Sequence, residues 1–276
     1  MRKLFSRQLV EARHEMLSIF EAVDLALHDA VRAYVEDDKK LASKTQDVTF
    51  QIDARCANLE AVCYNLIATQ SPVASDFRLL QTIIYIDFNL QRMCDKVRRI
   101  ARAAKRKVKN DIEVPAEMVQ LIDTEAQSVY RVLGATITAL VNNDLSTVLT
   151  LSDEDEAVHG TYQEFFRVFN RTETMDVADD AQMDDFRRTI MVSRYLDRIA
   201  SISMECAYRL VFLLTGQRWT AADLAEADED ELESMRIPSG EGVILDPVAD
   251  AHYVADLPLD EVGEQLAALI RESSQE

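Results

Sequence analysis

The sequence predicts an all-α fold of two tandem three-helix bundles, followed by a partly ordered acidic C-terminal extension. Three observations predict this fold. Few glycines and prolines interrupt residues 1–216, which favours long helices. Apolar residues recur there every three or four positions, as on one face of a helix, and the alternation typical of strands is absent. Finally, a constant numbering offset of 106 relates one half of this region to the other, which indicates an internal duplication.

Apolar stripes and the breaks between them place six helices. The first stripe runs from Met16 to Tyr34, and breaks follow at acidic, proline-containing and asparagine-rich stretches. Asp38 and Asp144 stand where a side chain can cap the second and fifth helices. The predicted helices cover residues 6–36, 38–69, 74–107, 116–142, 144–170 and 181–215.

The duplication is visible as matching residues at a single offset. Asp38 matches Asp144, and within the third and sixth predicted helices Leu90 matches Leu196. Because one offset serves three helices without gaps, we interpret the region as two copies of a unit of about a hundred residues. The predicted domains are residues 1–110 and 111–216 for the two bundles and residues 217–276 for the extension.

Composition limits the classes of function. The chain has 276 residues, and 30 Lys and Arg against 49 Asp and Glu give a formal net charge of −19. Such an acidic surface repels phosphate backbones, so we expect no nucleic acid as a partner. No apolar run approaches the roughly 18–20 residues of a membrane helix, and the first residues lack the apolar core of a signal peptide. We therefore expect a cytoplasmic protein.

The extension differs in composition from the rest of the chain. Residues 217–276 hold 3 Lys or Arg and 16 Asp or Glu, with three of the six glycines and three of the five prolines. This composition predicts partial disorder, with an acidic helical pattern over 221–236.

The four cysteines form no Cys-x-x-Cys pair. Cys56 and Cys63, seven residues apart, lie on one helical stripe. We expect all four, with Cys94 and Cys206, to be small buried core residues rather than disulfide partners or zinc ligands.

The third predicted helix opens with the segment Gln70-Ser-Pro-Val-Ala-Ser-Asp-Phe-Arg78 and continues into Asn89-Leu-Gln-Arg-Met-Cys-Asp95; the sixth carries Tyr195-Leu-Asp-Arg-Ile-Ala-Ser201. These segments resemble the PhoU family, the phosphate-signalling proteins of bacteria, over about residues 8–216. The resemblance implies tandem three-helix bundles, metal-binding acidic motifs and, often, a homodimer.

The family's metal motif is a carboxylate, three residues and a second carboxylate, which brings both side chains to one helical face. This sequence keeps one acid of each pair, because the motifs read Gln91-xxx-Asp95 and Asp197-xxx-Ser201. Oxygen-rich pockets of this kind suit iron, manganese, magnesium or zinc. The residues that the resemblance assigns to metal are Asp47, Asp53 and Asp95 in the first repeat and Asp153, His159 and Asp197 in the second. The alternative is that these side chains cap helices, pair with arginines or face water.

A run of nine Lys and Arg residues between 92 and 109 contains one acid, Asp95. Cations favour helix C-termini, so the run is compatible with a solvated helix end. The functional interpretation is a docking surface for an acidic partner or for anionic lipid beside a membrane complex. The candidate docking residues on the third and sixth helices are Arg92, Arg98, Arg99 and Arg198.

The resemblance implies a regulatory adaptor that couples a phosphate importer ATPase to a sensor histidine kinase and represses phosphate-starvation genes when phosphate is plentiful. No catalytic motif is visible in the sequence, so we expect no enzyme. Two alternatives stay open: a metal-binding carboxylate bundle, and a scaffold paralogue that has lost phosphate signalling.

Overall fold

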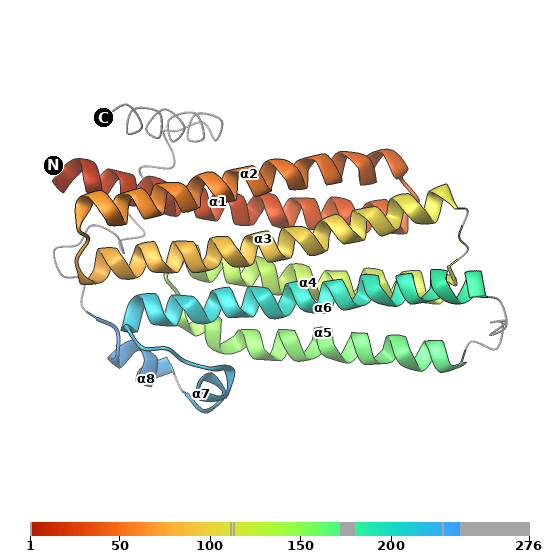
Figure 1. Ribbon diagram of the computed structural model, residues 1–276. Helices are drawn as coiled ribbons and strands as arrows, with labels where there is room; N and C mark the ends of the chain where they lie inside the picture. The colour runs from red at the N-terminus through yellow and green to blue at the C-terminus, as the bar shows by residue number, and fades with distance from the viewer. Residues whose placement is uncertain (1, 111, 113, 172–179, 228, 238–276) are drawn as a thin grey trace.

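The computed structural model describes residues 2–110, 112, 114–171, 180–227 and 229–237. Six long helices and two short ones account for most of this part of the chain (Figure 1), and it contains no strand. The helices are α1 (Arg2–Val35), α2 (Lys39–Gln70), α3 (Ala74–Lys109), α4 (Ala116–Asn142), α5 (Leu145–Arg171), α6 (Asp180–Thr215), α7 (Ala221–Glu226) and α8 (Glu229–Ser234).

The long helices lie side by side in two groups of three. Helices α1, α2 and α3 pack together, as do α4, α5 and α6, and the groups meet where α3 contacts α6 and α1 contacts α4. Helices α3 and α6 run in opposite directions along this contact (Figure 1), which we call the α3–α6 seam. The predicted all-α architecture is confirmed. No described helix is both long and apolar enough to cross a membrane.

The duplication extends to the ends of the helices. The first and last residues of α6 are those of α3 plus the offset of 106 found in the sequence. The first residue of α5 is likewise that of α2 plus 106. Asp38 accepts hydrogen bonds from two backbone N–H groups at the start of α2, and Asp144 does the same for α5. Both predicted caps are thereby confirmed. The residue before each, Asp37 and Asn143, is left-handed with φ of 58° and 53°, so both turns reverse the chain in the same way.

The buried apolar side chains of both repeats form one continuous core. All four cysteines belong to it and are free thiols, as predicted for Cys56, Cys63, Cys94 and Cys206. Burial raises the pKa of each thiol, which keeps it in the neutral form. These cysteines therefore act as small apolar residues.

A buried cation caps the same carbonyl in each repeat. Lys107 of α3 donates from Nζ to the Tyr34 carbonyl at the end of α1, at 3.1 Å. Arg13 of α1 donates to the equivalent Leu140 carbonyl at the end of α4, at 2.9 Å, and to the Asn143 side chain. The first cap stays within its repeat, whereas the second joins the two repeats.

The predicted acidic helical pattern over 221–236 corresponds to α7 and α8. Helix α7 begins with a capping box in which the Thr220 and Asp223 side chains each bond to the other residue's backbone N–H. The rest of the predicted extension, 238–276, lies outside the described residues.

Candidate functional site

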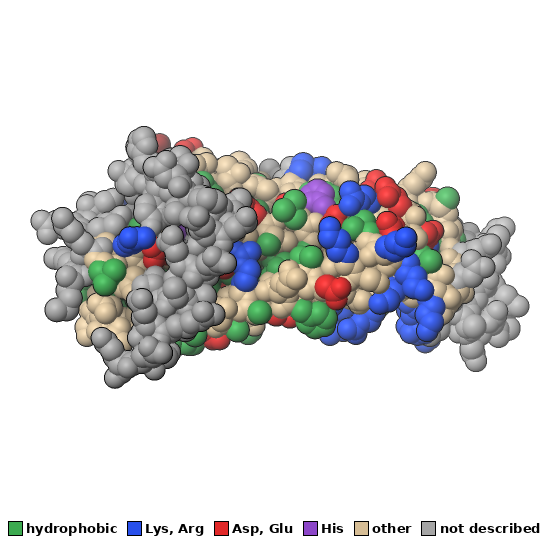
Figure 2. Space-filling model, turned by 90° about the horizontal axis from the view of Figure 1, so that it is seen from above, with side chains coloured by type: hydrophobic (Ala, Val, Ile, Leu, Met, Phe, Trp, Pro, Cys, Tyr) green, Lys and Arg blue, Asp and Glu red, His purple; other side chains and the backbone are tan. Residues whose placement is uncertain are grey.

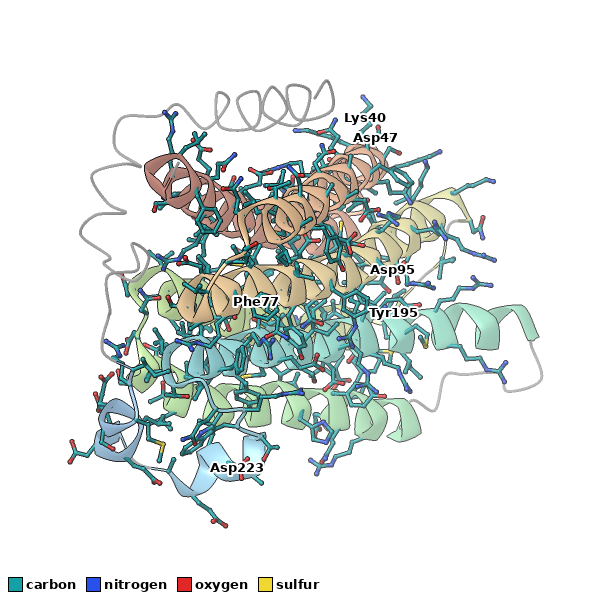
Figure 3. The ribbon with its side chains drawn as sticks, turned by 60° about the vertical axis from the view of Figure 1, so that its left-hand side comes forward. Lys40, Asp47, Phe77, Asp95, Tyr195 and Asp223 are labelled. Atoms are coloured by element: carbon teal, nitrogen blue, oxygen red, sulfur yellow. The ribbon has the colours of Figure 1, made fainter. Side chains whose placement is uncertain are left out.

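The first-repeat metal candidates do not converge. Figure 3 shows Asp47 on α2 apart from Asp95 on α3. Asp53 pairs with Arg98, and Asp95 accepts a hydrogen bond from Arg99 at 2.9 Å. Partial burial acts to raise the pKa of Asp95, but hydrogen bonds from its basic neighbours outweigh it and hold the pKa below its usual range. Two of the three carboxylates are therefore engaged by arginines of their own repeat.

The second-repeat candidates form a single pair in the described part of the chain. His159 Nδ1 lies 3.5 Å from Asp197 Oδ1. Ser201, where the family motif has its second acid, donates to the Asp197 carbonyl. The side chain of Asp153 lies outside the described residues.

Among the described residues, no three His, Cys, Asp or Glu side chains lie close enough together to hold a metal ion. The ion pairs at Asp53 and Asp95 correspond to the non-metal alternative that the sequence left open. Iron, manganese, magnesium or zinc at these positions stays a prediction.

The four candidate docking arginines differ in their surroundings. Arg92 bridges the α3–α6 seam to Glu205 at 3.0 Å and lies over the ring of Phe88, which is 60% exposed. Arg198 is exposed on α6. Arg98 instead turns towards α2, where Asp53 and the Thr49 hydroxyl accept from its guanidinium. Arg99 is also exposed, although it pairs with Asp95. Arg98 is therefore the least accessible of the four arginines.

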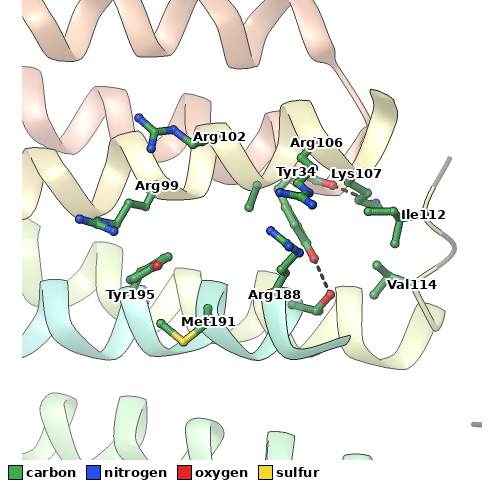
Figure 4. Close-up of a pocket in the computed structure, with 12 residues that line it drawn as sticks. Tyr34, Arg99, Arg102, Arg106, Lys107, Ile112, Val114, Arg188, Met191 and Tyr195 are labelled. Carbon is green, nitrogen blue, oxygen red and sulfur yellow. Dashed lines mark hydrogen bonds between the residues drawn. The ribbon is translucent and has the colours of Figure 1, made fainter. Parts of the chain in front are cut away.

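The basic run leads into a pocket at one end of the seam. Lys and Arg side chains gather towards this end, at the right of the view in Figure 2. The pocket has a volume of about 290 Å³ and lies between α3, α6, the last turn of α1 and the segment after α3 (Figure 4). Its lining residues, which define the basic pocket, are Tyr34, Arg99, Arg102, Ala103, Arg106, Lys107, Ile112, Val114, Arg188, Thr189, Met191 and Tyr195.

Hydrogen bonds between the repeats fix part of the basic pocket. Tyr34 donates its hydroxyl to Thr189 Oγ1 at 3.1 Å, which joins α1 to α6 (Figure 4). Burial raises the pKa of Tyr34 to about 12, with a smaller opposing effect from Thr189, so the phenol stays neutral. The Lys107 ammonium lies 5.1 Å from the centre of the Tyr34 ring and pairs with Asp37 at 2.8 Å. The inner part of the pocket thus holds polar groups that are paired with one another.

Sequence reasoning identified the α3 cations but missed the pocket that they line. Arg188 and Met191 enter from α6, and Ile112 enters from the segment after α3. The density of cations over 99–107 was the available signal. It gave no indication of which distant residues would close the space.

Two of the buried carboxyl groups among the described residues have a strongly raised pKa. Burial raises the pKa of Glu125 to about 9, against a smaller effect of the Ser193 hydroxyl. Burial also raises the pKa of Asp87 to about 6, although Gln91 donates to its Oδ2 at 3.1 Å. At neutral pH Glu125 is therefore protonated in the folded protein.

The sequence of this chain is similar to a known protein family. Residues 16–104 match the family model of the PhoU domain. A phosphate-specific transport system accessory protein PhoU homologue of Pseudomonas aeruginosa is 24% identical over 77% of this chain and 86% of its own length. A homologue of the same name from Clostridium acetobutylicum is 26% identical over 79% of this chain and 97% of its own length.

Solved structures match the fold. The crystal structure of PhoU from Pseudomonas aeruginosa has a TM-score of 0.69 and 23% identity, and covers 77% of this chain and 100% of its own. That of the phosphate transport system regulatory protein PhoU from Streptococcus pneumoniae has a TM-score of 0.68 and 21% identity, and covers 78% and 99%. The family model and these homologues confirm the resemblance that the sequence predicted.

Proposed function

We infer that the chain, which carries a PhoU domain and is homologous to PhoU proteins over more than three quarters of its length, regulates phosphate transport as an accessory protein. The observation that carries this proposal is that these relatives share one name and align with this chain over most of their length. Relatives named as accessory proteins of a phosphate-specific transport system align over 86–97% of their own length. The proposed role is regulatory, without covalent chemistry, and the proposed location is the cytoplasm.

The finer part of the proposal concerns partners. The chain acts as an adaptor between the ATPase subunit of a phosphate importer and a sensor histidine kinase, and represses phosphate-starvation genes when phosphate is plentiful. An adaptor transmits a signal only if it binds two states of its partner with different affinity. The proposed homodimer belongs to the same account.

The surface proposed for docking follows the exposed faces of α3 and α6. Phe88 supplies an exposed aromatic ring, and Arg92 lies over it while pairing with Glu205 of α6. Arg198 adds an exposed cation on α6, whereas Arg92 is half-buried. Aromatic and arginine side chains are the residue types that carry most of the binding free energy at protein interfaces, which supports this choice.

The test is genetic. Deletion of the gene in its host should raise expression from a phosphate-starvation promoter at high phosphate, and the wild-type gene should restore repression. An Arg92→Ala, Arg198→Ala double variant should restore less, whereas an Arg32→Ala, Arg131→Ala double variant, with the same change in charge on α1 and α4, should restore fully. Equal promoter activity with and without the gene would contradict the proposed function. Full repression by the Arg92→Ala, Arg198→Ala variant would show that these two arginines do not form the docking surface.

A further inference from the structure

The basic pocket carries far more positive than negative charge. Among its lining residues, all of which are described, five are cations and none is Asp or Glu. This contrasts with the chain as a whole, whose formal net charge is −19. A concave site of one sign on a surface of the opposite sign focuses the field and attracts counter-ions locally.

Two of the cations are compensated from outside the pocket. Asp95 pairs with Arg99, and Asp37 pairs with Lys107. Arg102 and Arg106 are exposed, and neither forms an ion pair within the described part of the chain. Two arginines on one helix, four residues apart, thus line the basic pocket without an ion-pair partner among the described residues.

The fold itself does not require these cations. At the end of α6, the counterpart positions in the second repeat hold Glu205, Tyr208 and Phe212 in place of Arg99, Arg102 and Arg106. The last turn of α6 contains no basic residue, although it ends a helix of the same length as α3. Stabilisation of a helix C-terminus therefore does not explain the arginines on α3, because the same helix end is stable without them.

The C-terminal end of α6, which corresponds to that of α3, has a pocket that is occupied by a side chain of the protein itself. A smaller pocket of about 90 Å³ there, which we call the aromatic pocket, is lined by Tyr85, Glu205, Tyr208, Arg209, Phe212, Arg218 and Trp219. Arg209 lies over the rings of Tyr85 and Phe212, at 4.8 and 4.1 Å from their centres. The aromatic pocket thus holds a cation of its own chain. The basic pocket has no corresponding anion among its described lining residues.

We propose that the basic pocket binds an anion that carries two or more phosphate groups in a chain. Arginine's planar guanidinium matches the oxygens of a phosphate group with two parallel hydrogen bonds, which favours phosphate over a single-atom anion. The pocket volume of about 290 Å³ is near the lower end of small-molecule sites and exceeds what one phosphate group fills. Two exposed arginines in line along α3 suit two linked groups.

Two kinds of molecule carry such linked phosphate groups: inorganic oligophosphates, and nucleoside di- or triphosphates. Ile112, Val114 and Met191 give the pocket an apolar wall against which a nucleotide base would pack. The inference goes beyond the proposed regulatory function and does not depend on it, because binding is measured on the purified chain without a transporter or kinase.

The test is calorimetric titration of the full chain with inorganic triphosphate, ATP and orthophosphate at one ionic strength, with poly-glutamate as an anion that carries no phosphate. We expect saturable binding of triphosphate or ATP at one site per chain, more tightly than orthophosphate. Tighter binding of triphosphate assigns the site to an inorganic chain, and tighter binding of ATP assigns it to a nucleotide. Absence of saturable binding for both, equally tight binding of orthophosphate, or stronger binding of poly-glutamate than of either would overturn the proposal.

Two variants locate the binding. Arg102→Gln with Arg106→Gln should weaken it by at least about tenfold, because two charge-assisted hydrogen-bond donors are lost. The control, Lys40→Gln with Lys44→Gln, makes the same change in net charge on exposed residues of α2 outside the pocket and should change the affinity by less than about threefold. An equal loss of affinity in both double variants would show that the anion is held by the overall positive charge at this end of the α3–α6 seam and not by the pocket, and would overturn the proposal.

A third variant tests the space rather than the charge. Met191→Trp places a larger side chain at the partly exposed apolar wall and leaves every cation in place. It should weaken binding of inorganic triphosphate, which has no base to stack on the ring, while the circular dichroism spectrum and the midpoint of thermal unfolding stay the same. Unchanged affinity in this variant would show that the ligand lies outside the pocket.

Discussion

The two ends of the α3–α6 seam have the same helical frame and opposite surface chemistry. Six of the seven residues that line the aromatic pocket are repeat counterparts of residues that line the basic pocket. At one end Arg102 and Arg106 line the basic pocket, and at the other their counterparts Tyr208 and Phe212 line the aromatic pocket, where Arg209 lies over the rings of Tyr85 and Phe212. The duplicated fold therefore constrains helix length and core packing but leaves the residues at the helix ends free to acquire different roles.

The two repeats also differ inside the core. Ile19 of α1 is fully buried, and its counterpart on α4 is the fully buried Glu125. Asp87 of α3 corresponds to Ser193 of α6, which is also buried. Each repeat thus tolerates a buried carboxyl group at a position where the other has an uncharged residue. Substitutions at such matched positions should therefore differ in their effect on the free energy of unfolding.

The largest effect is expected for Glu125→Ile, which installs the first repeat's residue in the second. Since the carboxyl group is protonated in the folded state up to a pKa of about 9 but ionises near 4.5 when unfolded, wild-type stability falls as pH rises between these values. The variant should be more stable at pH 8 by about 2–4 kcal/mol, measured by urea unfolding.

The pH dependence provides the control for Glu125. The stability difference between Glu125→Ile and the wild type should grow from pH 5 to pH 9, because only the wild type loses stability through this group. Glu117→Ile, at an exposed position of the same helix, should give a difference that does not change with pH. A constant difference for Glu125→Ile would mean that the buried carboxyl group does not titrate as described.

The next effect concerns the two buried cations that cap equivalent carbonyls. Arg13→Met should lower the free energy of unfolding by about 2–4 kcal/mol, because it removes donors to both Leu140 and Asn143. Lys107→Met should lower it by about 1–3 kcal/mol, because it leaves the Tyr34 carbonyl without this donor. Chemical denaturation of both variants checks the order, and a larger loss for Lys107→Met would contradict the account of these caps.

A smaller and symmetric effect is expected at the helix caps. Asp38→Ala and Asp144→Ala should each cost about 1 kcal/mol in thermal unfolding at neutral pH, because each removes acceptors for two backbone N–H groups. Burial acts to raise the pKa of Asp144, but hydrogen bonds from Thr147 and Ser146 outweigh it and lower the pKa. The cost of Asp144→Ala should therefore shrink as pH falls below about 4, where the carboxylate is protonated. A cost independent of pH would contradict the capping role.

The smallest effect on stability is expected when the end of α3 is given the residues of α6. Arg102→Tyr with Arg106→Phe should change the free energy of unfolding by less than about 0.5 kcal/mol, because both side chains are exposed. The same variant should lose the binding of inorganic triphosphate. Strong destabilisation would show that the arginines serve the fold, and intact binding would show that the two ends do not differ as described.

Much of the fold was predictable from the sequence because its signals are local. Periodic apolar residues and capping aspartates placed the six long helices within a few residues of their observed bounds, as at Asp38 and Asp144. The constant numbering offset between matching residues predicted the repeat. Local patterns also identified the cysteines as core residues, since they lie on apolar stripes.

The candidate sites were less predictable because they depend on contacts between distant segments. A helical stripe shows which face is buried but not which helix covers it, so the contact of Tyr34 with Thr189 had no local signal. Likewise, His28 stacks on Tyr130 of the other repeat, with ring centres 3.5 Å apart, a contact between residues about a hundred positions apart. Arg98 was predicted as a docking residue, but its pairing with Asp53 depends on how α2 packs against α3.

The central claim, that this chain is an accessory regulator of phosphate transport, is tested most directly by affinity purification of the full chain from its host at high and low phosphate. The account predicts recovery of a phosphate importer ATPase subunit in amounts that differ between the two conditions, with reduced recovery for Arg92→Ala, Arg198→Ala and unchanged recovery for Arg32→Ala, Arg131→Ala. Recovery of no transporter component at either phosphate level would contradict it.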